Sequence, residues 1–132
     1  MRGALRWLVL AAAVAGCGGH EGPVSGELSV RLTSPRNGDR AMLFRVVGPQ
    51  RGVTPAAGSS YRVFADTSAV GDTTWIVVIA PVGTGLASGE IIRLAVNDVR
   101  KAGSYRTAVS DIAAADYAVG DTAGVSLLVV KP

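Results

Sequence analysis

Histidine and cysteine are almost missing from this chain of 132 residues, which has one of each, Cys17 and His20. A single cysteine excludes a disulfide within the chain. A single histidine, three residues from that cysteine, argues against a Ser–His–Asp or Cys–His catalytic site, because such a site needs a histidine held by the fold. Histidine and cysteine are also the preferred ligands of zinc and copper. We therefore predict that the protein is not an enzyme and that it holds no cofactor and no metal.

The ten acidic residues offer little more chemistry. A glycosidase needs two carboxylates across a bound sugar. Most acidic residues here stand beside Gly, Asn, Ser or Thr, where solvated turn residues are expected. Asp116 and Asp121 flank one connection, but the aspartate spacing of an EF-hand is absent. We expect no metal site, and the alternative that the sequence leaves open is a calcium site built from loop aspartates.

The apolar run from Leu8 to Ala15 is too short to span a bilayer, which takes about 20 apolar residues. It follows two arginines, Arg2 and Arg6, and leads into the small residues of Val14-Ala15-Gly16-Cys17. A positive start, a short apolar segment and a small-residue end are typical of a secretory signal peptide. The last four of these residues resemble the lipobox of bacterial lipoproteins.

This resemblance implies that residues 1–16 are a lipoprotein signal peptide and that the Cys17 thiol takes up lipid. Residues 17–25 would then be a lipidated N-terminus and flexible tether, and acyl chains such as palmitate would anchor the protein to a membrane. Gly18 stands where the enterobacterial pattern has an aspartate in inner-membrane lipoproteins, which favours the outer membrane. The alternative is an ordinary secretory signal ending near Ala11-Ala12-Ala13.

The formal net charge of +3 overstates the basic character of the domain. Two of the thirteen basic residues, Arg2 and Arg6, lie in the predicted signal peptide, which leaves eleven basic and ten acidic residues and a net charge of +1. The remaining basic residues are dispersed along the chain. Nucleic-acid binding is therefore not expected.

From Gly26 onward the sequence predicts strands separated by turns. We expect strands over Glu27–Thr33, Ala41–Val47, Gly52–Pro55, Tyr61–Asp66, Thr73–Ala80, Glu90–Val96, Tyr105–Asp111 and Val125–Val130. Short strands at roughly ten-residue spacing predict one all-β domain over residues 26–132. This would be an immunoglobulin-like or cohesin-like β-sandwich of 7–9 strands, and a barrel is the chief alternative.

The segment Thr73–Ala80 is the most hydrophobic of these strands, with Trp75, Ile76, Val77, Val78 and Ile79 in series. A continuous apolar run rich in β-branched residues indicates a central strand that is covered on both faces. We therefore expect Trp75 to belong to the core rather than to an exposed sugar-binding surface.

Three stretches together resemble the cohesin-like and carbohydrate-binding-module type of β-sandwich. They are Gly26–Leu32 followed by Ala41–Val46, then Gly89–Val96, then Tyr105–Ala113. The resemblance covers most of residues 26–130 and is one of pattern, without a fixed motif. Cohesins bind dockerin modules and their relatives bind polysaccharides, so the resemblance implies a binding role, although a fold does not by itself supply a function.

Arginines fall at the middle of several predicted strands, and we take four of them as candidate binding residues. The candidates are Arg31, Arg45, Arg62 and Arg93, with Arg106 at a similar position. One interpretation is a shared arginine-bearing face that meets an anionic glycan or an acidic partner. The other is a set of outward residues that guard sheet faces and edges.

Together these patterns predict a lipid-anchored protein of the bacterial envelope with a non-catalytic protein-binding or scaffolding role. The alternative is a carbohydrate-binding module of the cell envelope. The expected partners are the membrane, through the lipid on Cys17, and an envelope protein or glycan.

Overall fold

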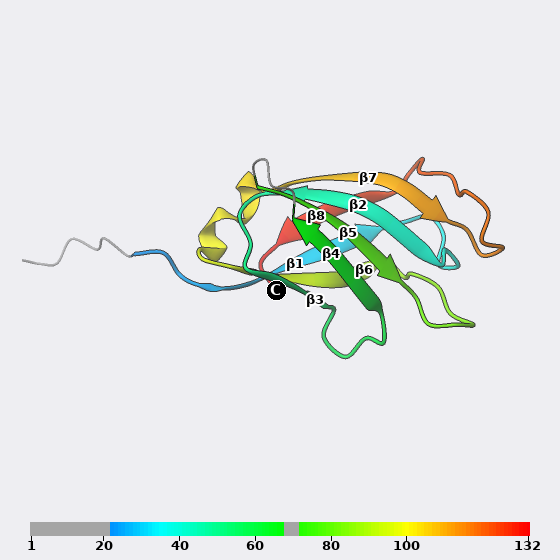
Figure 1. Ribbon diagram of the computed structural model, residues 1–132, viewed down its shortest axis with the longest axis horizontal. Helices are drawn as coiled ribbons and strands as arrows, with labels where there is room; N and C mark the ends of the chain where they lie inside the picture. The colour runs from blue at the N-terminus through cyan, green and yellow to red at the C-terminus, as the bar shows by residue number, and fades with distance from the viewer. Residues whose placement is uncertain (1–21, 68–71) are drawn as a thin grey trace, which may run out of the picture.

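A computed structural model describes residues 22–67 and 72–132 and contains two four-stranded antiparallel sheets over these ranges (Figure 1). Cys17, His20 and the predicted signal peptide lie outside the described residues. The strands are β1 (Gly26–Thr33), β2 (Ala41–Val47), β3 (Gly52–Pro55), β4 (Arg62–Thr67), β5 (Thr73–Ile79), β6 (Gly89–Val96), β7 (Arg106–Ala113) and β8 (Ser126–Val130), with a 3-10 helix η1 (Val99–Ser104) before β7. No helix in the described part of the chain is long and apolar enough to cross a membrane.

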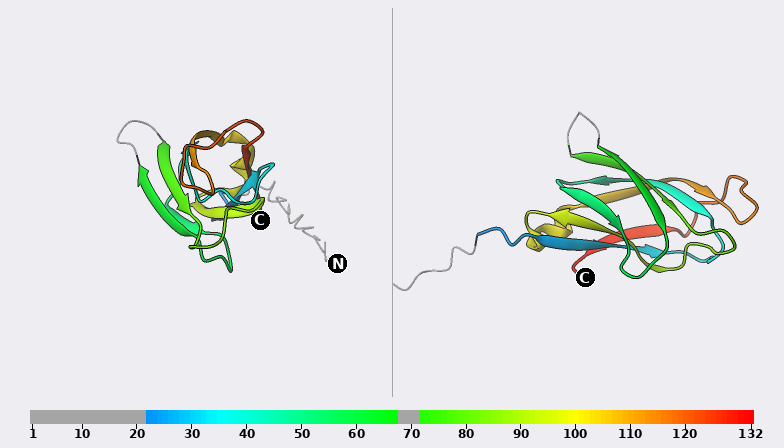
Figure 2. Two further views of the ribbon diagram at one scale, coloured as in Figure 1. Left: turned by 90° about the vertical axis from the view of Figure 1, so that its right-hand side faces the viewer. Right: turned by 60° about the horizontal axis from the view of Figure 1, so that its bottom comes forward.

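The strands pair in a nested way. One sheet, sheet A, has the order β3-β6-β1-β8, and the other, sheet B, has the order β4-β5-β2-β7. Strand β1 therefore pairs with β8, β2 with β7, β3 with β6 and β4 with β5, as if one long hairpin had been rolled up, which is also how jelly rolls are built. The end-on view in Figure 2 shows the two layers. The predicted all-β sandwich is confirmed, and the barrel alternative is wrong because the two sheets remain separate.

Alternation along the strands builds the core between the sheets. Successive side chains of a strand point to opposite faces, so every second residue reaches the interior. In β1 these are Leu28, Val30 and Leu32. The largest buried side chains from both sheets are Phe44, Leu28, Met42, Ile76, Ile91, Ile92 and Leu94, and Leu86 joins them from the β5–β6 connection.

Strand β5 lies between β4 and β2, so its predicted central position is confirmed. The prediction that it is covered on both faces is wrong. Thr74, Ile76 and Val78 are buried, but Trp75 stands on the opposite face and is 39% exposed. The expected core role of Trp75 is therefore also wrong, because the two-residue period places it with the outward set of the strand.

Candidate binding surface

The four candidate arginines do not share one face, so the interpretation as one arginine-bearing face is wrong, whereas their role as binding residues stays a prediction. Arg31 belongs to β1 and Arg93 to β6, both in sheet A. Arg45 belongs to β2 and Arg62 to β4, both in sheet B. Arg31, Arg45 and Arg93 each lie between two buried residues of their strands, and Arg62 precedes the half-buried Val63, so the two pairs point from opposite sides of the sandwich.

On sheet A the arginines are accompanied by carboxylates. Arg93 Nε lies 2.8 Å from Glu90 Oε1, and Arg93 Nη1 lies 3.5 Å from Glu27 Oε2. Arg31 stands opposite Glu90 in the register of β1 and β6. Glu90 is also hydrogen-bonded by Ser29. Much of the positive charge of this face is thus balanced within the face, which makes it a poor surface for an anionic ligand.

The outer face of sheet B is different, because apolar side chains occupy much of it. We call this surface the sheet B face. Its apolar members are Leu43 and Val47 from β2, Phe64 from β4, and Trp75, Val77 and Ile79 from β5. Phe64 is 53% exposed and Val47 is 40% exposed, while Leu43, Val77 and Ile79 are half-buried.

Trp75 stands in the middle of a cross-strand row on this face. Asp66 of β4 lies opposite it on one side, and Arg45 of β2 lies opposite it on the other. The next row places Phe64 opposite Val77, which in turn lies opposite Leu43. An aromatic ring flanked by one acidic and one basic side chain combines an apolar contact area with hydrogen-bonding groups at its rim.

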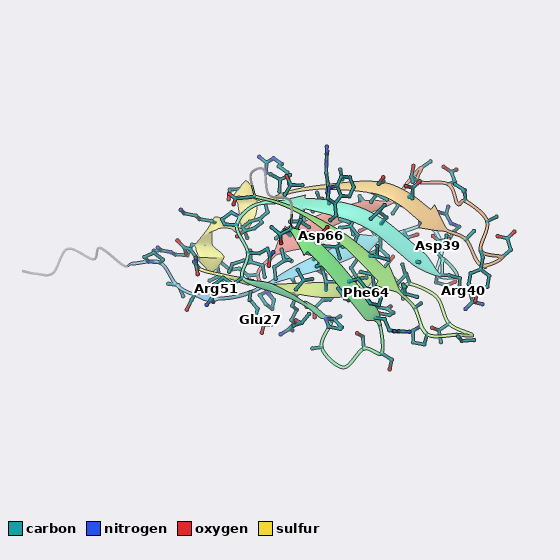
Figure 3. All side chains as sticks on the ribbon, in the orientation of Figure 1. Glu27, Asp39, Arg40, Arg51, Phe64 and Asp66 are labelled. Carbon is teal, nitrogen blue, oxygen red and sulfur yellow. The ribbon has the colours of Figure 1, made fainter. Side chains whose placement is uncertain are left out.

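Arg62 completes the outer positions of β4. Its guanidinium carbon lies 5.6 Å from the centre of the Phe64 ring, a cation–π distance. Strand β4 therefore presents Arg62, Phe64 and Asp66 along its outward side, and Figure 3 labels the last two. The two charges have opposite sign and flank the ring symmetrically.

An open hollow of about 210 Å³ adjoins the sheet B face where the β7–β8 connection folds over it. Leu43, Val77, Tyr117 and Val119 contribute to its lining. Tyr117 has a φ of 65°, and its backbone N–H donates to Ala114 O over 2.8 Å. Tyr117 is 68% exposed, and the guanidinium carbon of Arg40 lies 5.6 Å from the centre of its ring. The hollow extends the apolar surface toward this end of the sandwich.

The carboxylates with resolved pKa shifts belong to local ion pairs. Hydrogen bonds from Arg100 lower the pKa of Asp98 to about 2, against an opposing effect of burial. Burial would raise the pKa of Glu90, but bonds from Arg93, Ser29 and Ala57 lower it to about 2. Both groups are ionised at neutral pH. Within the described ranges, no three His, Cys, Asp or Glu side chains come together as metal ligands would.

The sheet B face was not predicted from the sequence, although one signal for it was present. Arg62, Phe64 and Asp66 alternate with Val63 and Ala65, and two charges on the same side of a strand indicate the solvent face. Phe64 shares that side and is therefore exposed. The phase of β5, which carries Trp75, then follows from its pairing with β4, and that pairing is not visible in the local pattern of β5.

Comparison with known proteins gives no relative: no protein family, no curated protein and no solved structure matches this chain.

Proposed function

We propose that this protein is a non-catalytic binding module of the bacterial envelope, anchored by lipid on Cys17, and that its sandwich domain binds a protein partner through the sheet B face. The observation that carries the proposal is the exposed pair Trp75 and Phe64, which stands among the aliphatic side chains of the sheet B face. Large contiguous apolar patches are uncommon on soluble proteins and mark interaction sites. Tryptophan is enriched among the residues that dominate binding energy at interfaces.

The neighbours of Trp75 favour a protein over a sugar. Sugars are held by aromatic stacking together with several polar groups that reach their hydroxyls. On the sheet B face, Arg45 and Asp66 lie directly opposite the ring, whereas its diagonal neighbours Leu43 and Val47 and its strand neighbour Val77 are aliphatic. Arg45 and Asp66 are then rim charges that select the partner more than they add affinity.

A glycan ligand is the second candidate, and the exposure of Trp75 and Tyr117 supports it. Both rings lie on the same side of the molecule as the open hollow, which Tyr117 helps to line. A flat aromatic pair can stack on sugar rings. The two candidates therefore concern the same surface and differ in the occupant.

The proposed anchor leaves the sheet B face accessible. Residues 22–25 leave the sandwich at its η1 end, ahead of β1, which belongs to sheet A (Figure 1). Val99 N–H donates to Val24 O over 2.8 Å, so the domain holds the chain from Val24 onward. A flexible linker of the six residues between Cys17 and Val24 would reach only about 13 Å in r.m.s. terms. The anchor would thus be attached through a strand of sheet A, and the apolar surface belongs to the other sheet.

Site-specific photo-crosslinking of the full chain in its native cells tests this proposal. A photoreactive residue in place of Val47 on the sheet B face should give one dominant protein adduct, which Trp75→Ala should abolish. The matched control replaces Leu128, which is 63% exposed on the outer side of β8 in sheet A, and should not give that adduct. Adducts that are the same at both positions would contradict a protein partner on this face. Removal of the predicted signal peptide, which contains Trp7, would leave Trp75 as the one tryptophan. A change in Trp75 fluorescence with envelope glycans would then support the glycan candidate.

A further inference from the structure

Four strands form the edges of the two sheets, and three of them are protected against pairing with another chain. Exposed edges offer unpaired N–H and C=O groups, and native proteins block them with short strands, proline, bulges or covering segments. Strand β3 has four residues and ends at Pro55. In β8, Thr107 Oγ1 donates to Leu127 O over 3.0 Å, and Lys131-Pro132 follow the strand.

Strand β7 is protected in two ways. Its pairing with β2 is interrupted by a bulge between the partners of Leu43 and Phe44. Its far end is covered by the connection that follows, because Gly120 N–H donates to Ile112 O over 2.7 Å and Val119 forms a bridge with Ala113.

Strand β4 carries two charged side chains, but its backbone has none of these protections among the described residues. It has six residues without proline, and its register with β5 runs without a bulge from Arg62 to Thr67. Its backbone pairs with β5 alone in the part of the chain that the structure describes. Figures 1 and 2 show β4 along the free margin of sheet B.

We propose that this edge pairs with the same edge of a second copy, antiparallel and around a two-fold axis at Phe64. The two-residue period restricts the registers, because a continuous sheet must keep the outward residues of both copies on one side. With the axis at Phe64, the two Phe64 residues stand opposite each other and Val63 stands opposite Ala65. Each Arg62 then stands opposite the Asp66 of the other copy.

The charges single out this register. An axis at Arg62 or at Asp66 would place two like charges directly opposite, which is destabilising in a sheet. An axis at Val63 or Ala65 would place Arg62 or Asp66 opposite Phe64 and leave both charges without a cross-strand partner of opposite sign. The axis at Phe64 alone gives two opposite-charge pairs and an aromatic pair, both of which stabilise antiparallel strands. This self-complementarity is why a second copy fits the edge better than an unrelated extended peptide.

Pairing in this way joins the two sheet B layers into one continuous sheet of eight strands. The two sheet B faces become one surface, with Phe64 at its centre and a Trp75 one strand further out on each side. The inference concerns the backbone edge and stands independently of the proposed partner and anchor. If both copies are anchored to one membrane, the two-fold axis must point along the membrane normal, because only this axis relates two anchors on the same side.

Disulfide capture of the full chain in its native membrane tests the register directly. Opposed Cα atoms of antiparallel strands are about 4.5–5.5 Å apart, and a disulfide spans about 4.4–6.8 Å. Phe64→Cys should therefore give a disulfide-linked dimer under mild oxidation. Leu128→Cys, at an exposed position of β8, and the unchanged chain with Cys17 should not. Equal yields from Phe64→Cys and Leu128→Cys would overturn the proposal.

Charge reversal tests the pairing without a new cysteine. Arg62→Asp or Asp66→Arg alone places like charges opposite each other twice in the dimer, and each should weaken dimerisation about tenfold in sedimentation of the detergent-solubilised full chain. The double change Arg62→Asp/Asp66→Arg restores opposite charges and should restore the dimer. Arg106→Asp, on the other edge of sheet B, should have no effect. The proposal would be overturned if the unchanged chain stayed monomeric, or if either single variant dimerised as strongly as the unchanged chain. Partner adducts at Val47 report on the proposed function separately.

Discussion

The hydroxyl of Ser29, a fully buried residue of β1, donates a 2.6 Å hydrogen bond to Glu90 Oε2 at the start of β6. Glu90 also accepts hydrogen bonds from Arg93 Nε at 2.8 Å and from the Ala57 N–H at 3.1 Å. Burial alone would raise the pKa of Glu90, but these bonds and the charge of Arg93 lower it from 4.5 to about 2. One carboxylate thus connects β1, β6 and the turn that follows β3.

This network predicts a stability that falls in acid. Because the folded pKa of Glu90 is lower than the unfolded one, ionised Glu90 stabilises the fold above about pH 4.5, and this contribution is lost as the pH falls toward 2. Partial exposure of Arg93 weakens the ion pair, so we expect a contribution of about 1–2 kcal/mol. Glu90→Gln should lower the free energy of unfolding by this amount at pH 7 and flatten its decline between pH 5 and 2. Denaturant titrations at each pH measure both effects.

Glu27→Gln is the matched control, since the Glu27 side chain is 49% exposed and lies 3.5 Å from the same arginine. A surface pair of this kind contributes between zero and about 1 kcal/mol. Equal pH profiles for Glu90→Gln and Glu27→Gln would contradict the assignment of the acid sensitivity to Glu90.

Gly48 has no room for a side chain. Its φ is +149°, and a Cβ built there would lie 2.3 Å from Cδ1 of Tyr105. Tyr105 is buried, and its hydroxyl donates to Pro49 O, so the ring is held in place. Gly48→Ala should therefore lower the free energy of unfolding by about 2–3 kcal/mol, from backbone strain and overpacking together.

Thermal or denaturant unfolding of Gly48→Ala checks this expectation beside Gly52→Ala. A Cβ at Gly52 would meet nothing within 4 Å, and that glycine lies at the start of the short strand β3. Gly52→Ala should be within about 0.5 kcal/mol of the parent. If Gly48→Ala lowered the free energy of unfolding as little as Gly52→Ala, the Tyr105 ring would have moved to make room for the new methyl group, and the expectation would be wrong.

The strands could be predicted from the sequence because alternation is local. Leu28, Val30 and Leu32 are buried as the period of two requires. Ser29 shows the limit of the rule: it has the outward phase of β1, yet the Glu90 and Arg93 side chains of the neighbouring strand cover it. That cover depends on the pairing of residues 61 positions apart, which no local pattern reveals.

The sheet B face was harder to predict for the same reason. In Thr73–Ile79 both phases are largely apolar, so the pattern alone could not say whether Trp75 or Ile76 faces the core. The four arginines all point outward from predicted strands, but nested pairing distributes these strands between two sheets. Long-range pairing decides which outward residues become neighbours, and the local sequence decides only which residues point outward.

The positions of Trp75 and Phe44 predict very different costs of truncation. Phe44 is fully buried in β2, whereas Trp75 is 39% exposed on the sheet B face. Phe44→Ala should lower the free energy of unfolding by about 3–5 kcal/mol, through lost burial and the cavity left behind. Trp75→Ala should cost about 1 kcal/mol, because only cross-strand contacts are lost.

Denaturant unfolding of the two variants gives the comparison, and partner crosslinking from Val47 gives a second readout. Trp75→Ala should remain folded and lose the adduct, which separates a binding role from a structural one. A cost for Trp75→Ala as large as for Phe44→Ala would mean that the ring supports the fold, and the sheet B face would lose its proposed central residue.

The proposed anchor predicts that Cys17→Ser releases the protein from membranes. The thiol is the group that takes up lipid in bacterial lipoproteins, and each buried acyl carbon contributes about 0.8 kcal/mol to membrane binding. The sandwich begins at Gly26, nine residues after Cys17, so the folded domain should be unaffected. Fractionation of cells that express the full chain should move the variant from the membrane to the soluble fraction, with unchanged thermal unfolding. The control is Ser25→Ala, an exposed position of the tether that should leave the protein in the membrane fraction. If Cys17→Ser stayed with the membrane, the segment Leu8–Ala15 or a partner would hold the protein there, and the lipobox interpretation would be wrong.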